Sequence, residues 1–440
     1  MTTVTPTTEL FGTPNVNTAK AQLSADIARY LALMNTTEAL GALAQVELAK
    51  RAEVFGYLPL ERQVELAEQM SRAQLTELIK AMSADERADL FQRLGDSLRI
   101  GLLAALAQAE RDDLLQLAGH EPGTAGAIMT SDYCTVGHAL SVDQAIKALR
   151  ESAPEAETIY QVYVLGAERR LVGVLSLRDL VVAEPEAPVA GLVCSHPVSA
   201  TVDSTQETVA RLIREYDLLA LPIVDGEQKL VGIVTCDDAM DVVVDEATED
   251  FHKGASIATH IGNLKDATIG LLYRKRVFWL VLLVFGNLFS GAGIAAFEDV
   301  IAANIALVFF LPLLVDSGGN AGAQSATLMV RALATGEVVL KDWLKLLGRE
   351  CLVALALGLT MAVAVALLGV MRGGPAIAAI VASSMVTIVI LGSVIGMSLP
   401  FLLSRLRLDP ATASGPLITS IADAAGVLVY FAIATQVLEL

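Results

Sequence analysis

One apolar stretch of the chain carries polar side chains at a regular spacing. Residues 311–337 read LPLLVDSGGNAGAQSATLMVRALATGE, and five polar residues follow one another there at steps of four, four, three and four. On a helix these steps place all five on one face; they are Asp316, Asn320, Gln324, Thr327 and Arg331. A carboxylate and amides at membrane depth are costly unless they face water or protein. The stretch therefore predicts a pore wall, and the alternative is a polar seam that only joins helices.

A second carboxylate, Asp423, stands near the middle of the last apolar segment among small residues. A lone charged residue inside a membrane span indicates a functional site. Mg²⁺ is usually held by one or two carboxylates while it keeps several waters, so Asp423 with backbone carbonyls suits it, and Asp316 and Asn320 are further candidate ligands. The scattered Cys and His residues indicate neither a zinc site nor a disulfide framework. Mn²⁺, Co²⁺ and Ca²⁺ stay open as alternatives.

The apolar residues of the chain are concentrated in its C-terminal part. Of the 440 residues 54% are hydrophobic, the mean hydropathy is +0.56, and charges become rare from Val277 onward. We predict five transmembrane helices within residues 273–440, at roughly 277–297, 300–322, 347–371, 375–403 and 411–437. Lys and Arg lie in alternate loops, which predicts a cytoplasmic N-terminus and a C-terminus outside. With no secretory signal peptide visible, we expect a multi-pass protein of the cytoplasmic membrane.

The soluble part begins with a polar stretch, residues 1–15, that we expect to be disordered. Residues 16–122 have a helical pattern in which leucine recurs every twelve residues, at Leu66, Leu78, Leu90, Leu102 and Leu114. This period predicts a stacked array of short helices. One long amphipathic helix is the alternative, but a period of twelve drifts around a helix face and leaves no seam.

An internal duplication follows in residues 123–245. RLVGVLSLRDL, at Arg170–Leu180, is matched by KLVGIVTCDDA at Lys229–Ala239, and each follows an apolar run and an amphipathic helix. Apolar runs broken by a turn indicate buried strands between helices. We therefore predict two α/β modules, at about 123–190 and 191–245.

The net charge of −18 lies almost entirely before the membrane part. Residues 201–250 alone hold thirteen Asp and Glu. This balance disfavours nucleic acid and suits cations. At spacings of three and four, Asp238, Asp241, Asp245 and Glu249 fall on one helix face, where like charges repel. A solvated helix surface is the simple account, and regulatory cation binding is the alternative that we favour.

Three stretches resemble the MgtE family of magnesium transporters and channels: the one at 311–337, EATEDFHKGA at 246–255 and DPATASGPLITSIADAAG at 409–426. The resemblance implies a multidomain fold: a helical N domain, a tandem pair of CBS domains, a connecting or plug helix at 246–272, and a five-helix membrane domain. It also implies a homodimer in the bilayer that imports Mg²⁺ and is gated by Mg²⁺ bound to acidic residues at the start of the plug helix.

The resemblance carries over to individual residues. Asp423 coincides with the Asp of the family's ion-selectivity site, where some members also have an Asn at the position of Gly415. The regulatory magnesium ligands would be drawn from Asp217, Asp238, Asp241, Asp245, Glu246, Glu249 and Asp250. The CBS pattern Gly-x-x-Ser/Thr-x-x-Asp is matched by Ser176 with Asp179 and by Thr235 with Asp238. That match permits ATP or another adenine nucleotide, whereas helix capping explains both motifs equally well.

The leading hypothesis is thus a CBS-regulated Mg²⁺ channel or transporter. The alternatives are a transporter of another divalent cation, such as Co²⁺ or Mn²⁺, and a membrane-anchored nucleotide or metal sensor that moves no ion. An enzyme is not predicted, because neither a Walker A motif nor GxSxG occurs and no nucleophile-and-base pattern is visible. Gly392 and Gly396 form a GxxxG pair that predicts close helix packing and a candidate dimer contact.

Overall fold

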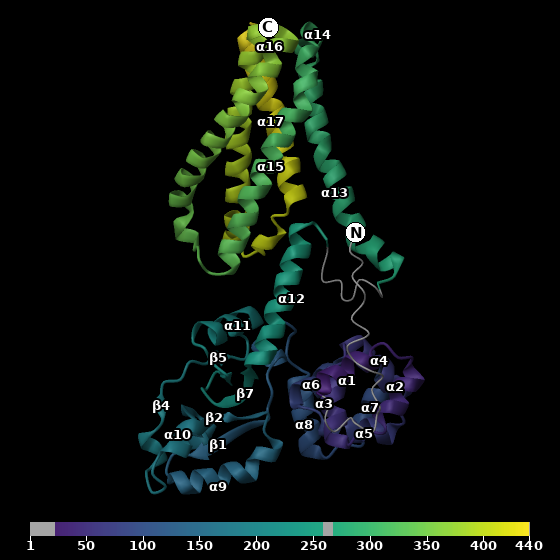
Figure 1. Cartoon of the computed structure of the whole chain (residues 1–440), viewed down its shortest axis with the longest axis vertical. Helices are drawn as coiled ribbons and strands as arrows, with labels where there is room; N and C mark the ends of the chain where they lie inside the picture. Colours follow the sequence, from purple (N-terminus) through teal and green to yellow (C-terminus); the bar gives the residue numbers. More distant parts are fainter. Residues whose placement is uncertain (1–22, 258–266, 440) are drawn as a thin grey trace, which may run out of the picture. The chain divides into compact units, whose positions relative to one another are not determined.

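The structure is a computed structural model that describes residues 23–257 and 267–439. The predicted disordered segment 1–15 lies outside the described residues. The chain divides after Val243 into two compact units, which we call the N-terminal unit and the C-terminal unit. Figure 1 shows short helices and two small sheets in the first unit and a bundle of long helices in the second.

A run of short helices opens the N-terminal unit, and from Thr36 to Gln108 a new helix begins at every twelfth residue. The bounds are α1 (Ser24–Leu31), α2 (Thr36–Leu43), α3 (Leu48–Gly56), α4 (Leu60–Gln69), α5 (Arg72–Ala81), α6 (Ala84–Arg93), α7 (Asp96–Leu103) and α8 (Gln108–Leu117). All five leucines of the repeat are at most 2% exposed. Helices next but one in sequence pack together, as α3 does with α5. The predicted array is confirmed, and one long helix is ruled out.

Turn chemistry between the helices explains why the array is not continuous. Before α5, the Ser71 hydroxyl accepts a hydrogen bond from the Gln74 amide, and the Gln74 side chain accepts one from the Ser71 amide. This capping box satisfies amides that a helix start leaves unpaired. Each short helix buries one apolar face against its neighbours, so the stack has a continuous core.

The duplicated sequence folds into two copies of a β-α-β-β-α unit (Figure 1). The first copy has β1 (Tyr133–Gly137), α9 (Val142–Ser152), β2 (Thr158–Leu165), β3 (Leu171–Ser176) and α10 (Leu177–Val182), with the short β4 (Cys194–Ser195) added. The second has β5 (Ala200–Thr201), α11 (Gln206–Glu215), β6 (Ala220–Val224), β7 (Leu230–Thr235) and α12 (Cys236–Gly254). The sheet orders are β1-β2-β3-β4 and β5-β6-β7, with a parallel first pair and an antiparallel second pair in each copy.

Two backbone bridges join these copies into one body. Arg170 pairs with Lys229, at equivalent places in the two repeats, and Thr130 pairs with Ile233 in β7. The segment before β1 therefore joins the sheet of the second copy. The apolar runs predicted as strands are β2 and β6, and every residue of β6 is buried.

The helix predicted to link the two halves as far as residue 272 ends much earlier. α12 stops at Gly254, and α13 begins at Ile269; the intervening residues 258–266 are outside the described part. Ser256 takes a left-handed φ of 59°, the Ser256 amide donates to Lys253 O, and the Ile257 amide donates to His252 O. These two bonds form a Schellman motif, which satisfies the last carbonyls and ends a helix. The prediction of a continuous plug helix over 246–272 is wrong for this reason.

The C-terminal unit contains long apolar helices. They are α13 (Ile269–Ala295), the short α14 (Glu298–Ala303), α15 (Ala306–Ala334), α16 (Trp343–Arg405) and α17 (Gly415–Leu438). Four of them are long and apolar enough to span a membrane. α16 is broken at Gly374, whose φ of 78° and ψ of −172° are not helical. Gly358 packs on Val386, and Gly369 packs on Ala378, so the limbs of α16 run antiparallel as a hairpin. These limbs are the third and fourth apolar segments predicted from the sequence.

Small residues set how closely α15 and α16 approach. Gly392 lies against the carbonyl of Gly318, and Gly396 lies against the carbonyl of Gly322, without room for a Cβ. Two GxxxG pairs therefore interlock within one chain. The prediction of close packing at Gly392 and Gly396 is confirmed, but their suggested use as a dimer contact is wrong, because α15 of the same chain already covers them.

The fold class predicted from the sequence is confirmed: a helical N-terminal array, a CBS pair with mixed sheets, and a C-terminal bundle of apolar helices. The number of membrane crossings stays a prediction.

Candidate cation sites

The polar face predicted for α15 is present and points away from the core of the C-terminal unit. Ser317, Gly318 and Gly322 on the neighbouring face are buried. The five residues spaced along the polar face are all exposed: Asp316, Asn320, Gln324, Thr327 and Arg331. A single chain therefore leaves a carboxylate, two amides and a guanidinium uncovered along a helix long enough to span a membrane.

Two carboxylates approach each other where α15 packs on α17. Asn320 Nδ2 donates a hydrogen bond to Asp316 Oδ2 over 2.9 Å. A Cβ on Gly319 would lie 3.3 Å from Asp423 Oδ1, so the Asp423 carboxylate rests beside the backbone of α15. One turn earlier in α15, Val315, the sequence neighbour of Asp316, lies 3.9 Å from the place of a Cβ on Gly426 of α17. The structure thus brings Asp316, Asn320 and Asp423 into one region.

Gly415 does not belong to that region. It is the first residue of α17, and Asp423 follows eight residues later, which is about 12 Å along a helix. Its neighbours are Ala323 and the carbonyl of Gly254, each 3.9 Å from the place of a Cβ. The structure therefore places Gly415 at the end of α17 near α12, separate from the carboxylate pair.

In the N-terminal unit, Asp238 at the start of α12 faces acids of α6 that the sequence did not single out. Its pKa is raised to about 7, first by burial and next by the charge of Asp85. Burial and Asp85 also raise the pKa of Glu86 to about 7. Burial raises the pKa of Asp85, and Asp85 Oδ1 is a buried oxygen without a hydrogen-bond partner among the described residues. Glu157 adds a further negative charge to this group.

We call Asp85, Glu86, Glu157 and Asp238 the acidic cluster. No twelve-residue pattern marks Asp85 or Glu86, because both occupy the first turn of α6, where acids are ordinary. Arg87 and Arg93 in the same helix also balance their charge in the sequence, so no local signal singles them out. The tertiary fold, which sets α6 against the second CBS copy, creates the cluster.

The acids at the C-terminal end of α12 are arranged differently, around one lysine. Lys253 Nζ lies 2.8 Å from Glu249 Oε1 and 2.6 Å from Asp409 Oδ2, and Asp409 precedes α17. Close by, the hydroxyls of Ser256 and Ser414 share a buried hydrogen bond of 2.7 Å. Burial, and next the charge of Asp409, raise the pKa of Asp250. The end of α12 is therefore fixed to the start of α17 by an ion pair and a hydroxyl pair.

The other predicted regulatory acids do not converge. Asp217 lies in a left-handed turn before β6 with a φ of 51°, and Asp241, Asp245 and Glu246 lie along α12. Across residues 23–257 and 267–439, no three His, Cys, Asp or Glu side chains gather into a group that could hold a metal ion. The candidate cation ligands are thus pairs or loose clusters of oxygen donors.

The possible nucleotide-binding residues act as helix caps. The Ser176 hydroxyl accepts from the Asp179 amide over 3.1 Å, and the Thr235 hydroxyl donates to the Asp238 carboxylate. The first contact is part of a capping box at the start of α10, and the second joins two side chains at the start of α12. A cavity of about 590 Å³ between α6, α8 and the CBS sheets is lined by Arg87, Asp113, Tyr133 and Arg169 among others, and by none of these four capping residues.

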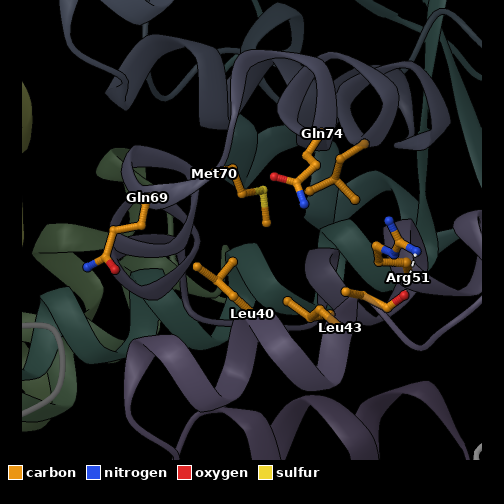
Figure 2. Close-up of a pocket in the computed structure, with 8 residues that line it drawn as sticks. Leu40, Leu43, Arg51, Gln69, Met70 and Gln74 are labelled. Atoms are coloured by element: carbon orange, nitrogen blue, oxygen red, sulfur yellow. Dashed lines mark hydrogen bonds between the residues drawn. The ribbon is translucent and has the colours of Figure 1, made fainter.

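A smaller pocket, of about 100 Å³, lies within the helical array (Figure 2). Leu40, Met70 and Gln74 are among its lining residues. Arg51, at its edge in Figure 2, donates to the carbonyls of Ala44 and Val46 over 3.3 and 2.8 Å. Because the Arg51 guanidinium stabilises the turn before α3 through these bonds, we assign no ligand to this pocket.

Family models match the N-terminal unit and most of the long apolar helices, and leave residues 246–310 between them unmatched. The MgtE intracellular N domain matches residues 23–123, the CBS domain matches 125–186 and 189–245, and the MgtE divalent cation transporter model matches 311–433. The magnesium transporter MgtE of Thermus thermophilus is 42% identical over 323 residues, which are 73% of this chain and 72% of that relative. The chain belongs to the MgtE family.

A second curated relative agrees with this membership, and one solved structure is also similar. The magnesium transporter MgtE of Bacillus subtilis is 39% identical over 320 residues, which cover 72% of this chain and 70% of the relative. A solved structure of the cytosolic domain of the Mg²⁺ channel MgtE in complex with ATP is 35% identical, with a TM-score of 0.49, and the match covers 52% of this chain and 93% of that one. As a member of a transporter family with long apolar helices, the protein is a membrane protein.

Proposed function

We propose that the protein carries Mg²⁺ across the cytoplasmic membrane through a path lined by the polar face of α15 and by Asp423 of α17. The observation that carries this proposal is the exposed row from Asp316 to Arg331 on a membrane-length helix. Such a row is costly against lipid, so it faces water or protein. Its carboxylate and amide oxygens suit a hydrated Mg²⁺. The relatives that cover most of the chain are magnesium transporters.

The path is completed by a second copy of the chain. No element within residues 23–257 and 267–439 of the same chain covers the polar face of α15, and a two-fold assembly would turn the two faces toward each other. Two copies of Asp423 would then supply the two carboxylates that Mg²⁺ usually takes. Five crossings, with the two limbs of α16 counted separately, place the N-terminal unit in the cytoplasm and the C-terminus outside.

Mg²⁺ in the cytoplasm acts as the regulator of the path. The acidic cluster offers only oxygen donors, and one of them, Asp85 Oδ1, is buried and makes no hydrogen bond with the residues that the structure describes. Two carboxylates ~4 Å apart repel by ~4 kcal/mol at an effective dielectric of ~20, so a bridging cation stabilises the arrangement in which α6 meets α12. Moving a gate from almost all open to almost all closed needs ~5.5 kcal/mol of differential binding. A few bridged pairs are of that order.

Flux into liposomes tests the function. Purified protein should admit Mg²⁺ when the internal concentration is low, with Co²⁺, Mn²⁺ and Ca²⁺ compared on the same preparation. Asp423→Ala should abolish the flux while the protein keeps its elution volume and helical content, and Asp423→Asn should fail as well if the charge is required. Normal Mg²⁺ flux through a folded Asp423→Ala protein would overturn the proposal.

ATP or another adenine nucleotide remains a predicted ligand of the CBS pair through Ser176, Asp179, Thr235 and Asp238. Titration of the protein with ATP, repeated for Asp179→Asn, checks it. Equal affinity of the two proteins would leave these residues with their capping role alone.

A further inference from the structure

The carboxylates of α15 and α17 stand at different levels along the two helices. α15 and α17 run antiparallel: the Tyr430 hydroxyl donates to Leu307 O over 2.9 Å, and Gly322 packs on Ile418. Gly319 lies beside Asp423, whereas Val315, next to Asp316, lies near Gly426. Asp316 is three residues before Gly319, which is about 4.5 Å along the axis. Asp316 therefore sits one turn farther toward the C-terminal end of α17 than Asp423 does.

The side-chain amide of Asn320 hydrogen-bonds the carboxylate of Asp316. Its nitrogen donates to Asp316 Oδ2 at a distance of 2.9 Å, one helical turn away. That bond fixes the direction of the carboxylate through its Oδ2. Both side chains are exposed on the polar face of α15. Asn320 is thus placed to orient the carboxylate of Asp316.

Two carboxylates about one helical turn apart can form neighbouring binding sites between which a cation moves during conduction. Their mutual repulsion is relieved when a cation sits at either of them. Conduction requires sites that bind strongly enough for entry and weakly enough for exit, and two neighbouring sites achieve this better than one deep site. In the topology proposed above, the level of Asp316 is the outer one.

We propose that Asp316 is the first carboxylate that a hydrated divalent cation meets on its way from the outside to Asp423, and that Asn320 is a positioning residue for it. This inference rests on the proposed function. It differs from the sequence-based prediction, in which Asn320 was a ligand of equal standing. The competing account is an i, i+4 side-chain pair that stabilises α15 and touches no ion.

The test compares Asp316→Asn, Asn320→Ala and Asn320→Gln in liposomes of known orientation. Thr360→Val is the control, because Thr360 is exposed on α16, outside the polar face of α15, and its hydroxyl donates to Ala356 O of its own helix. Asp316→Asn should raise the outside Mg²⁺ concentration for half-maximal flux by about tenfold. The half-maximal concentration measured with Mg²⁺ added on the side of the N-terminal unit should change less. Asn320→Ala should raise the outside value by about threefold, and Asn320→Gln should restore it, because the longer amide still reaches Asp316. Thr360→Val should change neither half-saturation value.

The outcomes separate this inference from the proposed function. If Asp423→Ala abolishes flux while Asp316→Asn leaves the outside half-saturation value unchanged, Asp316 is only part of a helix-surface pair and the inference falls alone. Equal effects on both sides would overturn the order of the two carboxylates. A loss in Asn320→Ala that Asn320→Gln does not restore would overturn the positioning role. Flux that survives Asp423→Ala would remove the proposed path itself.

Discussion

At the scale of single residues, the acidic cluster consists of carboxyl groups whose ionisation is disfavoured in the folded protein. Asp238 and Glu86 have pKa values near 7, and burial is the first cause for each. In the folded arrangement they hold protons that they would lose at about pH 4 when unfolded or separated. Their contribution to stability is thus fully present below about pH 4 and is lost as the pH rises through about 7.

This sign predicts that protons and Mg²⁺ compete for the cluster. Binding of Mg²⁺ requires ionised carboxylates, so the Mg²⁺ concentration that half-protects the N-terminal unit from protease should fall from about pH 6 to about pH 8. Without Mg²⁺, protection should instead be greater at the lower pH. Asp238→Asn should flatten both dependences, and Asp112→Asn, at an exposed acid of α8, should leave them intact. An Asp238→Asn protein with the wild-type pH profile would contradict this assignment.

At the scale of elements, an ion pair joins the end of α12 to the start of α17. Lys253 is a built-in cation between Glu249 and Asp409, and the Schellman motif brings Ser256 to Ser414. Because Lys253 already neutralises Glu249, we expect Mg²⁺ regulation to depend more on Asp238 than on Glu249. The ion pair holds the end of the connecting segment against the helix that carries Asp423.

Breaking that ion pair should make closure by Mg²⁺ harder. Lys253→Met should raise the internal Mg²⁺ concentration for half-closure by about fivefold, on the order of 1 kcal/mol for a partly exposed pair. Asp409→Asn should act similarly, and the double variant should be less than additive, since both remove one interaction. Closure curves from liposome flux give the values, and Lys341→Met, at an exposed lysine before α16, serves as the control. Unchanged closure in Lys253→Met would leave the contact a purely structural one.

At the scale of the whole molecule, the predicted topology depends on the hairpin of α16. Gly374 lets the chain reverse within one long apolar run, so the number of apolar limbs is one more than the number of long helices. An odd number of crossings puts the two ends of the chain on opposite sides of the membrane.

Accessibility of tags checks this topology. Tags at the N-terminus and near Lys341 should be protected in intact cells, and a tag after Leu440 should be accessible from outside, because Lys and Arg favour the cytoplasmic loops. A C-terminal tag that is reached only after permeabilisation would show an even number of crossings and would reverse the proposed levels of Asp316 and Asp423.

The sequence by itself determined what depends on local spacing. The twelve-residue period predicted the helical array, the duplicated RLVGVLSLRDL pattern predicted the paired α/β modules, and the four-residue steps predicted one polar face on α15. Each signal is local because a helix or strand fixes which neighbours in sequence share a face.

Tertiary structure decided what depends on distant residues. Asp85 and Glu86 meet Asp238 only because α6 packs on the second CBS copy, and Gly392 faces Gly318 only because α16 folds back beside α15. The end of α12 was also not predicted from the local sequence, because EATEDFHKGA is compatible with a longer helix. The helix ends where Ser256 adopts a left-handed φ and its hydroxyl hydrogen-bonds that of Ser414. Burial and close approach are properties of packed pairs, and the order of residues along one chain does not specify which pairs will meet.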